Sequence, residues 1–277
     1  MIETVKHLAY ILKCKTSPRE LRTICADLSH PDHINDSKYY RKKVEIKIKA
    51  GKPKERILYP SKGRLKLIQE RIKSNILSKI VLPDFVQGGV KGRSNLTNAL
   101  IHKGKRYKFT TDIRKFFPSV TSEMVYKMLL DYKFSPDVAR TLTLLCTYKG
   151  MLPQGTPTST HIANLVFLPL DWEIQKNFPL PNMFYSRFVD DVTISSNNDF
   201  KAFVQSILKT ITDSSFRISH QKTHYNGISD ITGIDVAYNG LRPNKKFLDK
   251  LNEENQTENQ KNGRLTYFNR VMAANQQ

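Results

Sequence analysis

Hydrophobic and polar positions follow two different periods along this chain, and together they predict a mixture of helices and strands. Apolar residues spaced three or four apart predict helices within five ranges: 2–28, 65–80, 121–148, 199–213 and the segment after an Asn-, Gln- and Glu-rich connection at 252–262. Apolar residues at every second position of 44–50 and 56–60, on either side of a Gly-Lys-Pro turn at 51–53, predict a β-hairpin. Two β-prone runs, 105–113 and 185–195, predict further strands, and the second run bends at two aspartates. This order of elements indicates the α+β class with an antiparallel sheet in the middle.

The composition excludes several classes of protein. With 277 residues, of which 39% are hydrophobic, the chain is long and apolar enough to bury a core. Its three cysteines are far apart and include no CxxC pair, which argues against a disulfide framework or zinc ribbon and favours a reducing compartment. Apolar runs are shorter than the roughly 18 residues that span a membrane, and the N-terminal apolar patch is too short for a secretory signal. We therefore expect a soluble, cytoplasmic protein with no membrane partner.

Positive charge is concentrated in the first part of the chain. The formal net charge is +20, and residues 1–110 contain 26 Lys and Arg against nine Asp and Glu. Fifteen of these basic residues lie between Lys38 and Lys79, interleaved with tyrosines. A solubilising surface is the simpler interpretation of a basic segment, but an imbalance of this size repels itself unless a polyanion is bound. The charge therefore predicts a nucleic-acid partner whose binding weakens as salt rises.

Three aspartates carry the strongest chemical signal. Asp112 ends one β-prone run, and Asp190 and Asp191 lie at the bend of the other. If the two runs pair in one sheet, the three carboxylates converge at one edge, where like charges require compensation by divalent metal. Two Mg²⁺ ions held about 4 Å apart by such a cluster activate an attacking hydroxyl and stabilise a leaving group. The alternative is that the pair occupies an ordinary turn and that Asp112 ends a strand without a chemical role.

The segments after these acids suggest a nucleotide site. Phe116 and Phe117 follow Asp112 closely, and a ring at Phe117 that curls back over the metal site would exclude a ribose 2′-hydroxyl. A core phenylalanine is the alternative. Gln154 and Gly155 lie in a Pro-Gln-Gly turn that opens a helix, where an amide side chain can line a base.

Taken in order, these motifs resemble those of bacterial reverse transcriptases. FTTDIRKFFPSV, LPQGTPTSTHIANL, YSRFVDDVTIS, SHQKTHY and ITGIDV are similar to the palm motifs of that family, and RILYPSKGRLKLIQERI is similar to its fingers motif. The resemblance runs from about residue 56 to 240. It implies a right-hand polymerase: an N-terminal helical extension (1–30), fingers (31–110), a palm (111–238) and a short thumb (239–277).

The resemblance assigns roles to residues of this chain. It implies that the metal ligands are Asp112, the carbonyl of Ile113, Asp190 and Asp191, and that Lys222 is the general acid toward pyrophosphate. Residues matching the family's nucleotide site are Lys54, Arg56, Phe116, Phe117, Gln154 and Gly155. The catalytic turn reads FVDD, whereas the family usually has tyrosine and a small residue before the two acids. Because both acids remain, activity is expected, with altered fidelity or nucleotide handling.

Two shorter matches indicate the retron subfamily. Asn98, Ala99 and His102 fit an NAxxH signature, and Thr232 and Gly233 fit a VTG signature in which Ile replaces Val. Without the family, Asn98 and His102 would be interpreted as a structural pair on one helix face.

The resemblance implies an RNA-directed DNA polymerase that uses two Mg²⁺ ions and dNTPs to copy a cognate structured non-coding RNA into single-stranded DNA (msDNA). The primer would be a 2′-hydroxyl of that RNA, and the setting would be antiviral defence against phage beside an effector protein. Three alternatives stay open: another defence-associated reverse transcriptase, a non-catalytic RNA-binding module with a polymerase fold, and a two-metal nuclease.

Overall fold

The computed structural model describes residues 2–30, 36–49, 52–253 and 255–276, and their contacts divide the chain into two compact units. Unit 1 comprises residues 1–81 and 115–168, and unit 2 comprises residues 82–114 and 169–277. Each unit therefore contains two separate stretches of sequence. The division into consecutive fingers, palm and thumb ranges stays a prediction. The two units do not test it, because neither unit is a single consecutive range.

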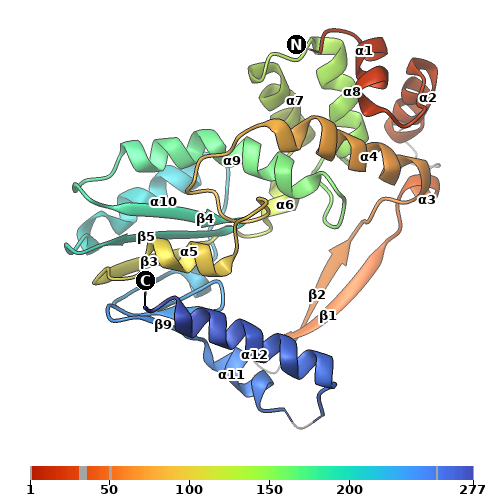
Figure 1. Ribbon diagram of the computed structural model, residues 1–277. Coiled ribbons are helices and arrows are strands. Elements are labelled where there is room, and N and C mark those ends of the chain that lie inside the picture. The colour runs from red at the N-terminus through yellow and green to blue at the C-terminus, as the bar shows by residue number, and fades with distance from the viewer. Residues whose placement is uncertain (1, 31–35, 50–51, 254, 277) are drawn as a thin grey trace. The chain divides into compact units, whose positions relative to one another are not determined.

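Unit 1 is a group of helices from which a two-stranded hairpin extends (Figure 1). Helices α1, α2 and α4 pack with α8, and α7 packs on α8. The bounds of its elements are α1 Val5–Leu12, α2 Pro18–Ser29, α3 Asp36–Tyr39, β1 Lys43–Lys49, β2 Lys52–Leu58, α4 Gly63–Asn75, a 3-10 turn Leu77–Lys79, α6 Phe116–Ser119, α7 Ser122–Asp131 and α8 Pro136–Cys146. Helix α9, Ser159–Lys176, begins in unit 1 and ends in unit 2.

Capping residues explain why these helices begin where they do. The side chains of Thr4, Ser17, Thr121 and Ser135 each accept a hydrogen bond from a backbone N–H of the first turn. The predicted N-terminal helix at 2–28 is two helices, because Lys13 and Lys15 adopt positive φ and Ser17 with Pro18 starts a new helix. The predicted helix at 65–80 likewise ends at Asn75.

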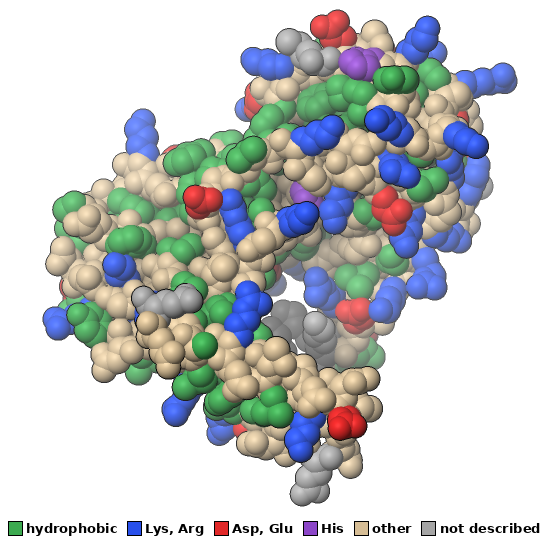
Figure 2. Space-filling view, in the orientation of Figure 1, with side chains coloured by type: hydrophobic (Ala, Val, Ile, Leu, Met, Phe, Trp, Pro, Cys, Tyr) green, Lys and Arg blue, Asp and Glu red, His purple; other side chains and the backbone are tan. Residues whose placement is uncertain are grey.

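The hairpin of unit 1 differs from its prediction at the turn. Strands β1 and β2 pair antiparallel from Lys43 opposite Leu58 to Lys49 opposite Lys52. Residues 50 and 51 lie outside the described residues, and Lys52 and Pro53 belong to β2, whereas the sequence placed them in the turn. Proline is tolerated here because a two-stranded ribbon consists of edge strands. Figure 2 shows Lys and Arg side chains gathered over α2, α4 and this hairpin.

Unit 2 contains a four-stranded sheet in the order β4-β5-β3-β6 and a three-stranded sheet β7-β8-β9. The first sheet is antiparallel, as predicted, and β3 and β5 are its central strands. The bounds are α5 Asn95–Ile101, β3 Tyr107–Asp112, β4 Phe184–Phe188, β5 Asp191–Ser196, a 3-10 turn Lys201–Phe203, α10 Val204–Asp213, a 3-10 turn His220–Lys222, β6 His224–Asn226, β7 Ser229–Ile231, β8 Ile234–Val236, β9 Leu241–Pro243, α11 Lys245–Leu251 and α12 Glu258–Ala273.

The second sheet of unit 2 has its own small core. Ile231, Ile234, Val236 and Leu241 from its strands pack with Val271 of α12 and with α5, and Figure 1 shows α12 running beside β9. Helix α12 begins at Glu258, within the predicted connection at 252–262. The sequence missed this start because the polar first turns carry no apolar period, whereas Thr257 and Gln260 form a capping box there.

The described helices include none that is long and apolar enough to cross a membrane.

Candidate active site

The three predicted aspartates converge at one end of the four-stranded sheet. Asp112 is the last residue of β3 and lies opposite Asp191, the first residue of β5. Asp190 precedes it in the two-residue turn that joins β4 to β5. One carboxylate oxygen from each of the three residues lies within 4.8 Å of the others. The two β-prone runs pair antiparallel, and the three carboxylates converge at one edge of the sheet, as predicted from the sequence.

The electrostatics of this cluster favour a bound cation. Asp112 is buried, and burial together with the charges of Asp190 and Asp112 raises the pKa of Asp191 to about 7. Carboxylate oxygens are the ligands that hard divalent cations prefer, and a cation removes the repulsion that raises this pKa. The residues present thus fit a divalent metal site. Ile113 adjoins the site, because its N–H donates a 2.8 Å hydrogen bond to the carbonyl of Asp190.

Lys222 contacts this cluster directly. The segment before it pairs with the end of β3: the N–H of Ser219 donates to the carbonyl of Asp112 at 2.8 Å. The Lys222 ammonium then donates to Oδ2 of Asp112. Burial alone would lower the pKa of Lys222, but the contact with Asp112 and the nearby charges of Asp191 and Asp190 raise it. Lys222 is therefore protonated at neutral pH.

Two of the predicted nucleotide-binding residues meet within unit 1, although they lie 98 positions apart in the chain. Arg56 at the end of β2 donates from Nε to Oε1 of Gln154 at 3.0 Å. The Pro-Gln-Gly turn is fixed beside β2 because the N–H of Tyr59 donates to the carbonyl of Gln154 at 2.9 Å. Gly155 adopts a φ of +94° there, a conformation that favours glycine. The amide of Gln154 and the guanidinium of Arg56 therefore lie next to each other.

The two adjacent phenylalanines of unit 1 are not equivalent. Phe116 is buried and meets Phe167 edge to face with ring centroids 5.5 Å apart, so it belongs to the core. Phe117 is half-buried at the start of the short helix α6. Lys54 lies in β2, and its side chain is outside the described part of the structure. The structure thus assembles two sets of predicted residues, each within its own unit.

The NAxxH and ITG segments form one buried polar network in unit 2. Asn98, Ala99 and His102 are fully buried. The His102 ring lies between two serine hydroxyls, with Nδ1 2.7 Å from Ser195 and Nε2 2.8 Å from Ser186. The Ser186 hydroxyl also donates to Asn98 at 2.7 Å. Burial lowers the pKa of His102 to about 3, so the ring is neutral at pH 7.

This network joins the two subfamily signatures. The amide of Asn98 donates to the hydroxyl of Thr232 at 3.3 Å, and Thr232 and Gly233 form the positive-φ turn between β7 and β8. The N–H of Gly233 donates to Asp230. These contacts connect α5 with both sheets, including β4, the strand that leads to the β4–β5 turn.

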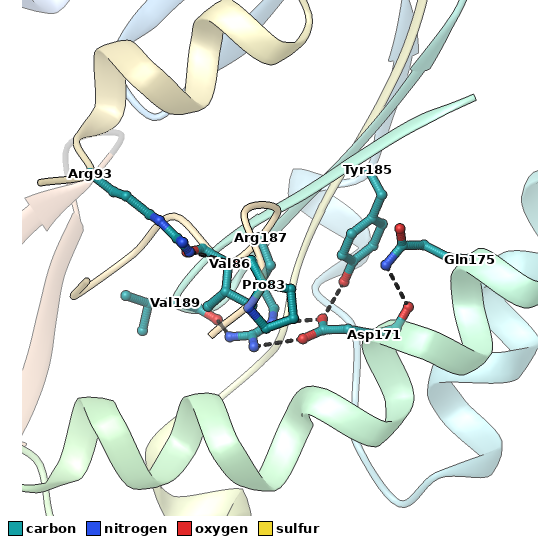
Figure 3. Close-up of polar contacts among 8 residues, drawn as sticks. All are labelled: Pro83, Val86, Arg93, Asp171, Gln175, Tyr185, Arg187 and Val189. Carbon is teal, nitrogen blue, oxygen red and sulfur yellow. Dashed lines mark hydrogen bonds and ion pairs between the residues drawn. The ribbon is translucent and has the colours of Figure 1, made fainter. Parts of the chain in front are cut away.

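The sequence did not reveal the ion pair beside the β4–β5 turn. Arg187 of β4 and Asp171 of α9 are fully buried and joined by two hydrogen bonds of 2.8 Å, as Figure 3 shows. The Tyr185 hydroxyl also donates to Asp171. An available signal was the lone acid in the apolar segment 167–172, together with an arginine inside a β-prone run.

Comparison with known proteins agrees with this geometry. The sequence profile of the family described as reverse transcriptase (RNA-dependent DNA polymerase) matches residues 43–235. The chain belongs to this family. Among curated proteins it is 33% identical over 227 residues to the retron Se72 reverse transcriptase of Salmonella heidelberg (strain 579083-10), covering 76% of this chain and 57% of that protein. It is also 33% identical over 153 residues to the retron Ec86 reverse transcriptase of Escherichia coli, covering 55% of this chain and 48% of that protein.

The relatives are thus reverse transcriptases of the retron type, and the chain spans about half the length of those it matches. A solved structure of telomerase from Candida albicans, in complex with a fragment of telomeric RNA, aligns with a TM-score of 0.53 at 8% identity, covering 81% of this chain and 48% of that one. This likeness concerns the fold alone. It supports the predicted α+β right-hand polymerase class.

Proposed function

We propose that this chain is an RNA-directed DNA polymerase of retron type, which copies a structured RNA into single-stranded DNA. The observation that carries the proposal is the convergence of Asp112, Asp190 and Asp191, with Lys222 in direct contact with Asp112. Three acids and one lysine in this arrangement suit nucleotidyl transfer. The substrates are dNTPs, and the cofactor is a pair of Mg²⁺ ions held by the three carboxylates and the carbonyl of Ile113.

We assign a part in this reaction to residues of both sets. Bound divalent cations lower the pKa of an attacking hydroxyl and neutralise the charge that develops on the phosphates. Lys222 holds a proton at neutral pH and donates it toward the leaving pyrophosphate. Arg56 and Lys54 bind the triphosphate, Gln154 orients the nucleotide, and Phe117 excludes the 2′-hydroxyl.

The partner we propose is a structured non-coding RNA that serves as template and, through an internal 2′-hydroxyl, as primer. The basic residues of 1–110 support a polyanionic partner, and the curated relatives named above are retron enzymes. Two further proposals rest on the family resemblance of the sequence alone: a role in phage defence beside an effector protein, and a cytoplasmic location.

Primer extension tests the activity. An RNA template with an annealed primer, dNTPs and Mg²⁺ is incubated with the wild type, with Asp190→Asn/Asp191→Asn, and with Asp213→Asn as a control. Asp213 is an exposed acid on α10 whose partner is Lys209. We expect DNA synthesis by the wild type and the control, and a loss of at least about 1,000-fold in the double variant. Equal extension by all three proteins would refute the catalytic assignment.

The same assay separates the alternative functions. Replacement of Phe117 by Ala is expected to permit incorporation of ribonucleotides, a change that a nuclease would not show. A non-catalytic RNA-binding module would hold the same RNA with or without the aspartates and would make no DNA.

A further inference from the structure

The turn that carries Asp190 and Asp191 has a strained backbone. Phe188 and Asp191 pair across it, so Val189 and Asp190 are its two central residues. Val189 has a φ of +61°, and positive φ at the first central position of such a turn is normally taken by glycine. A β-branched residue in this region is an outlier that persists only where its surroundings hold it.

A buried guanidinium holds this residue from one side. Arg187 donates from Nη1 to the carbonyl of Val189 at 3.0 Å (Figure 3). Its Nε and Nη2 atoms donate to the two carboxylate oxygens of Asp171, each at 2.8 Å. Because the guanidinium is planar, the two bonds to Asp171 fix the direction in which Nη1 points.

The loop before α5 also contacts the end of β4 and the turn that follows it. The N–H of Arg187 donates to the carbonyl of Phe85, and the N–H groups of Gln87 and Gly88 donate to the carbonyl of Arg187. A Cβ atom on Gly88 would lie 2.4 Å from the backbone nitrogen of Val189. The loop is itself fixed by Arg93, which donates to the carbonyls of Pro83 and Val86.

These contacts indicate that Arg187 positions the β4–β5 turn rather than stabilises the fold. A buried ion pair is often replaced by apolar residues without loss of stability, so its presence alone is weak evidence for a stabilising role. An apolar pair cannot donate to the carbonyl of Val189, however. The two residues that follow that carbonyl are metal-binding aspartates, and displacement of such groups by about 1 Å lowers reaction rates on the order of 100-fold.

We propose that Arg187 is a positioning residue for the catalytic turn: oriented by Asp171, it holds Val189 in its strained conformation and so sets the separation of Asp190 and Asp191 from Asp112. This inference rests on the proposed polymerase function. Arg187 acts through the turn, because its side chain is fully buried.

The test removes the donor while keeping the packing. Arg187→Met/Asp171→Leu replaces the ion pair by apolar side chains, and Leu208→Ala in α10 serves as a control that lowers stability away from the turn. Binding of Mn²⁺ alone is measured by calorimetry, and kcat and the dNTP KM are measured by primer extension. We expect Mn²⁺ affinity to fall at least tenfold and kcat at least 30-fold in the double variant, with the KM unchanged, and neither to fall in Leu208→Ala.

A second substitution tests separately whether Arg187 acts by holding the strained φ of Val189. Glycine accepts positive φ without strain, so adding Val189→Gly to the double variant is expected to restore Mn²⁺ affinity at least threefold.

If the double variant does not fold, Arg187→Lys replaces it, since lysine pairs with Asp171 but lacks the planar fork. Wild-type Mn²⁺ affinity and kcat in either variant would overturn the proposal. A wild type that binds Mn²⁺ but makes no DNA would instead refute the polymerase function, and the Mn²⁺ measurements would still decide the role of Arg187.

Discussion

The β4–β5 turn of unit 2 and the β1–β2 hairpin of unit 1 are both antiparallel pairs that bear charged residues, but they are held in different ways. Arg187 beside the β4–β5 turn is fully buried and hydrogen-bonded to both Asp171 and Val189 (Figure 3). In the hairpin, Val44, Ile46 and Ile57 are 47%, 66% and 43% exposed. Arg41 and Lys42 at its start are exposed as well.

This difference is the one expected if the turn binds cations and the hairpin binds phosphates. Carboxylates that share cations must keep fixed separations, so their support is buried, polar and specific. Basic residues that bind phosphates need a charge and a long side chain. Exposed Lys and Arg side chains supply both without fixed packing. Substitutions at the turn are therefore expected to change the reaction rate, whereas those at the hairpin change affinity.

Among substitutions that keep the three aspartates, the largest effect on the rate is expected at Gly88, where an added Cβ would meet the backbone of Val189. Gly88→Ala would force the loop and the turn apart, lowering the primer-extension rate on the order of 100-fold and the free energy of unfolding by about 1–3 kcal/mol. Gly263→Ala in α12 is the control, because Gly263 has no positive φ and a Cβ there meets nothing within 4 Å. Equal rates in the two variants would show that the loop does not support the turn.

Removal of charge immediately before the hairpin should alter RNA binding and leave the fold intact. For Arg41→Ala/Lys42→Ala, we expect the slope of log affinity against log salt to become shallower by about 1.4, because each single-strand phosphate that a cation neutralises contributes about 0.7. Filter binding between 50 and 300 mM salt measures the slope. Lys209→Ala, in an exposed ion pair on α10, should leave it unchanged. An unchanged slope in the double variant would place the RNA elsewhere.

Acid should destabilise the buried network around His102. The pKa of His102 is about 3 in the folded protein, lowered by burial and by Lys108 and Lys105, and about 6.5 in an unfolded chain. Because the unfolded state binds the proton more tightly, the stability is fully present above pH 6.5. It falls by up to about 1.4 kcal/mol per pH unit as the pH drops below this value.

Urea unfolding of the wild type and His102→Gln at pH 7.5 and 5.5 isolates this contribution, because the other titrating groups are common to both proteins. The wild type should lose more stability than the variant over this interval. The same loss in both would mean that His102 is not the group responsible.

The smallest effect is expected on the exposed apolar face of the hairpin. Ile46→Ala should change the free energy of unfolding by less than about 0.5 kcal/mol, since Ile46 is 66% exposed. Ile194→Ala, at a fully buried position of β5, should cost about 2–5 kcal/mol. Thermal and urea unfolding provide the comparison. A large loss at Ile46 would show that this face is covered in solution.

Much of the site could be predicted because its signals are local. Alternating apolar residues marked β3 and the β4–β5 pair, and the acids lie where those patterns end. The antiparallel pairing then followed from the strand–turn–strand form of 185–195. Boundaries were less accurate wherever polar capping residues decide them, as at Ser17 and Thr257.

The sequence by itself determined the order of the main elements, the identity of the acids and lysine at the site, and the positive charge of the first 110 residues. These properties depend on residue type and on neighbours within a few positions. Only the tertiary structure decided that Arg187 meets Asp171 and that His102 lies between two serines, one of them 93 positions away. Such contacts depend on which buried polar groups the packing brings together, because each must find a partner once water is excluded.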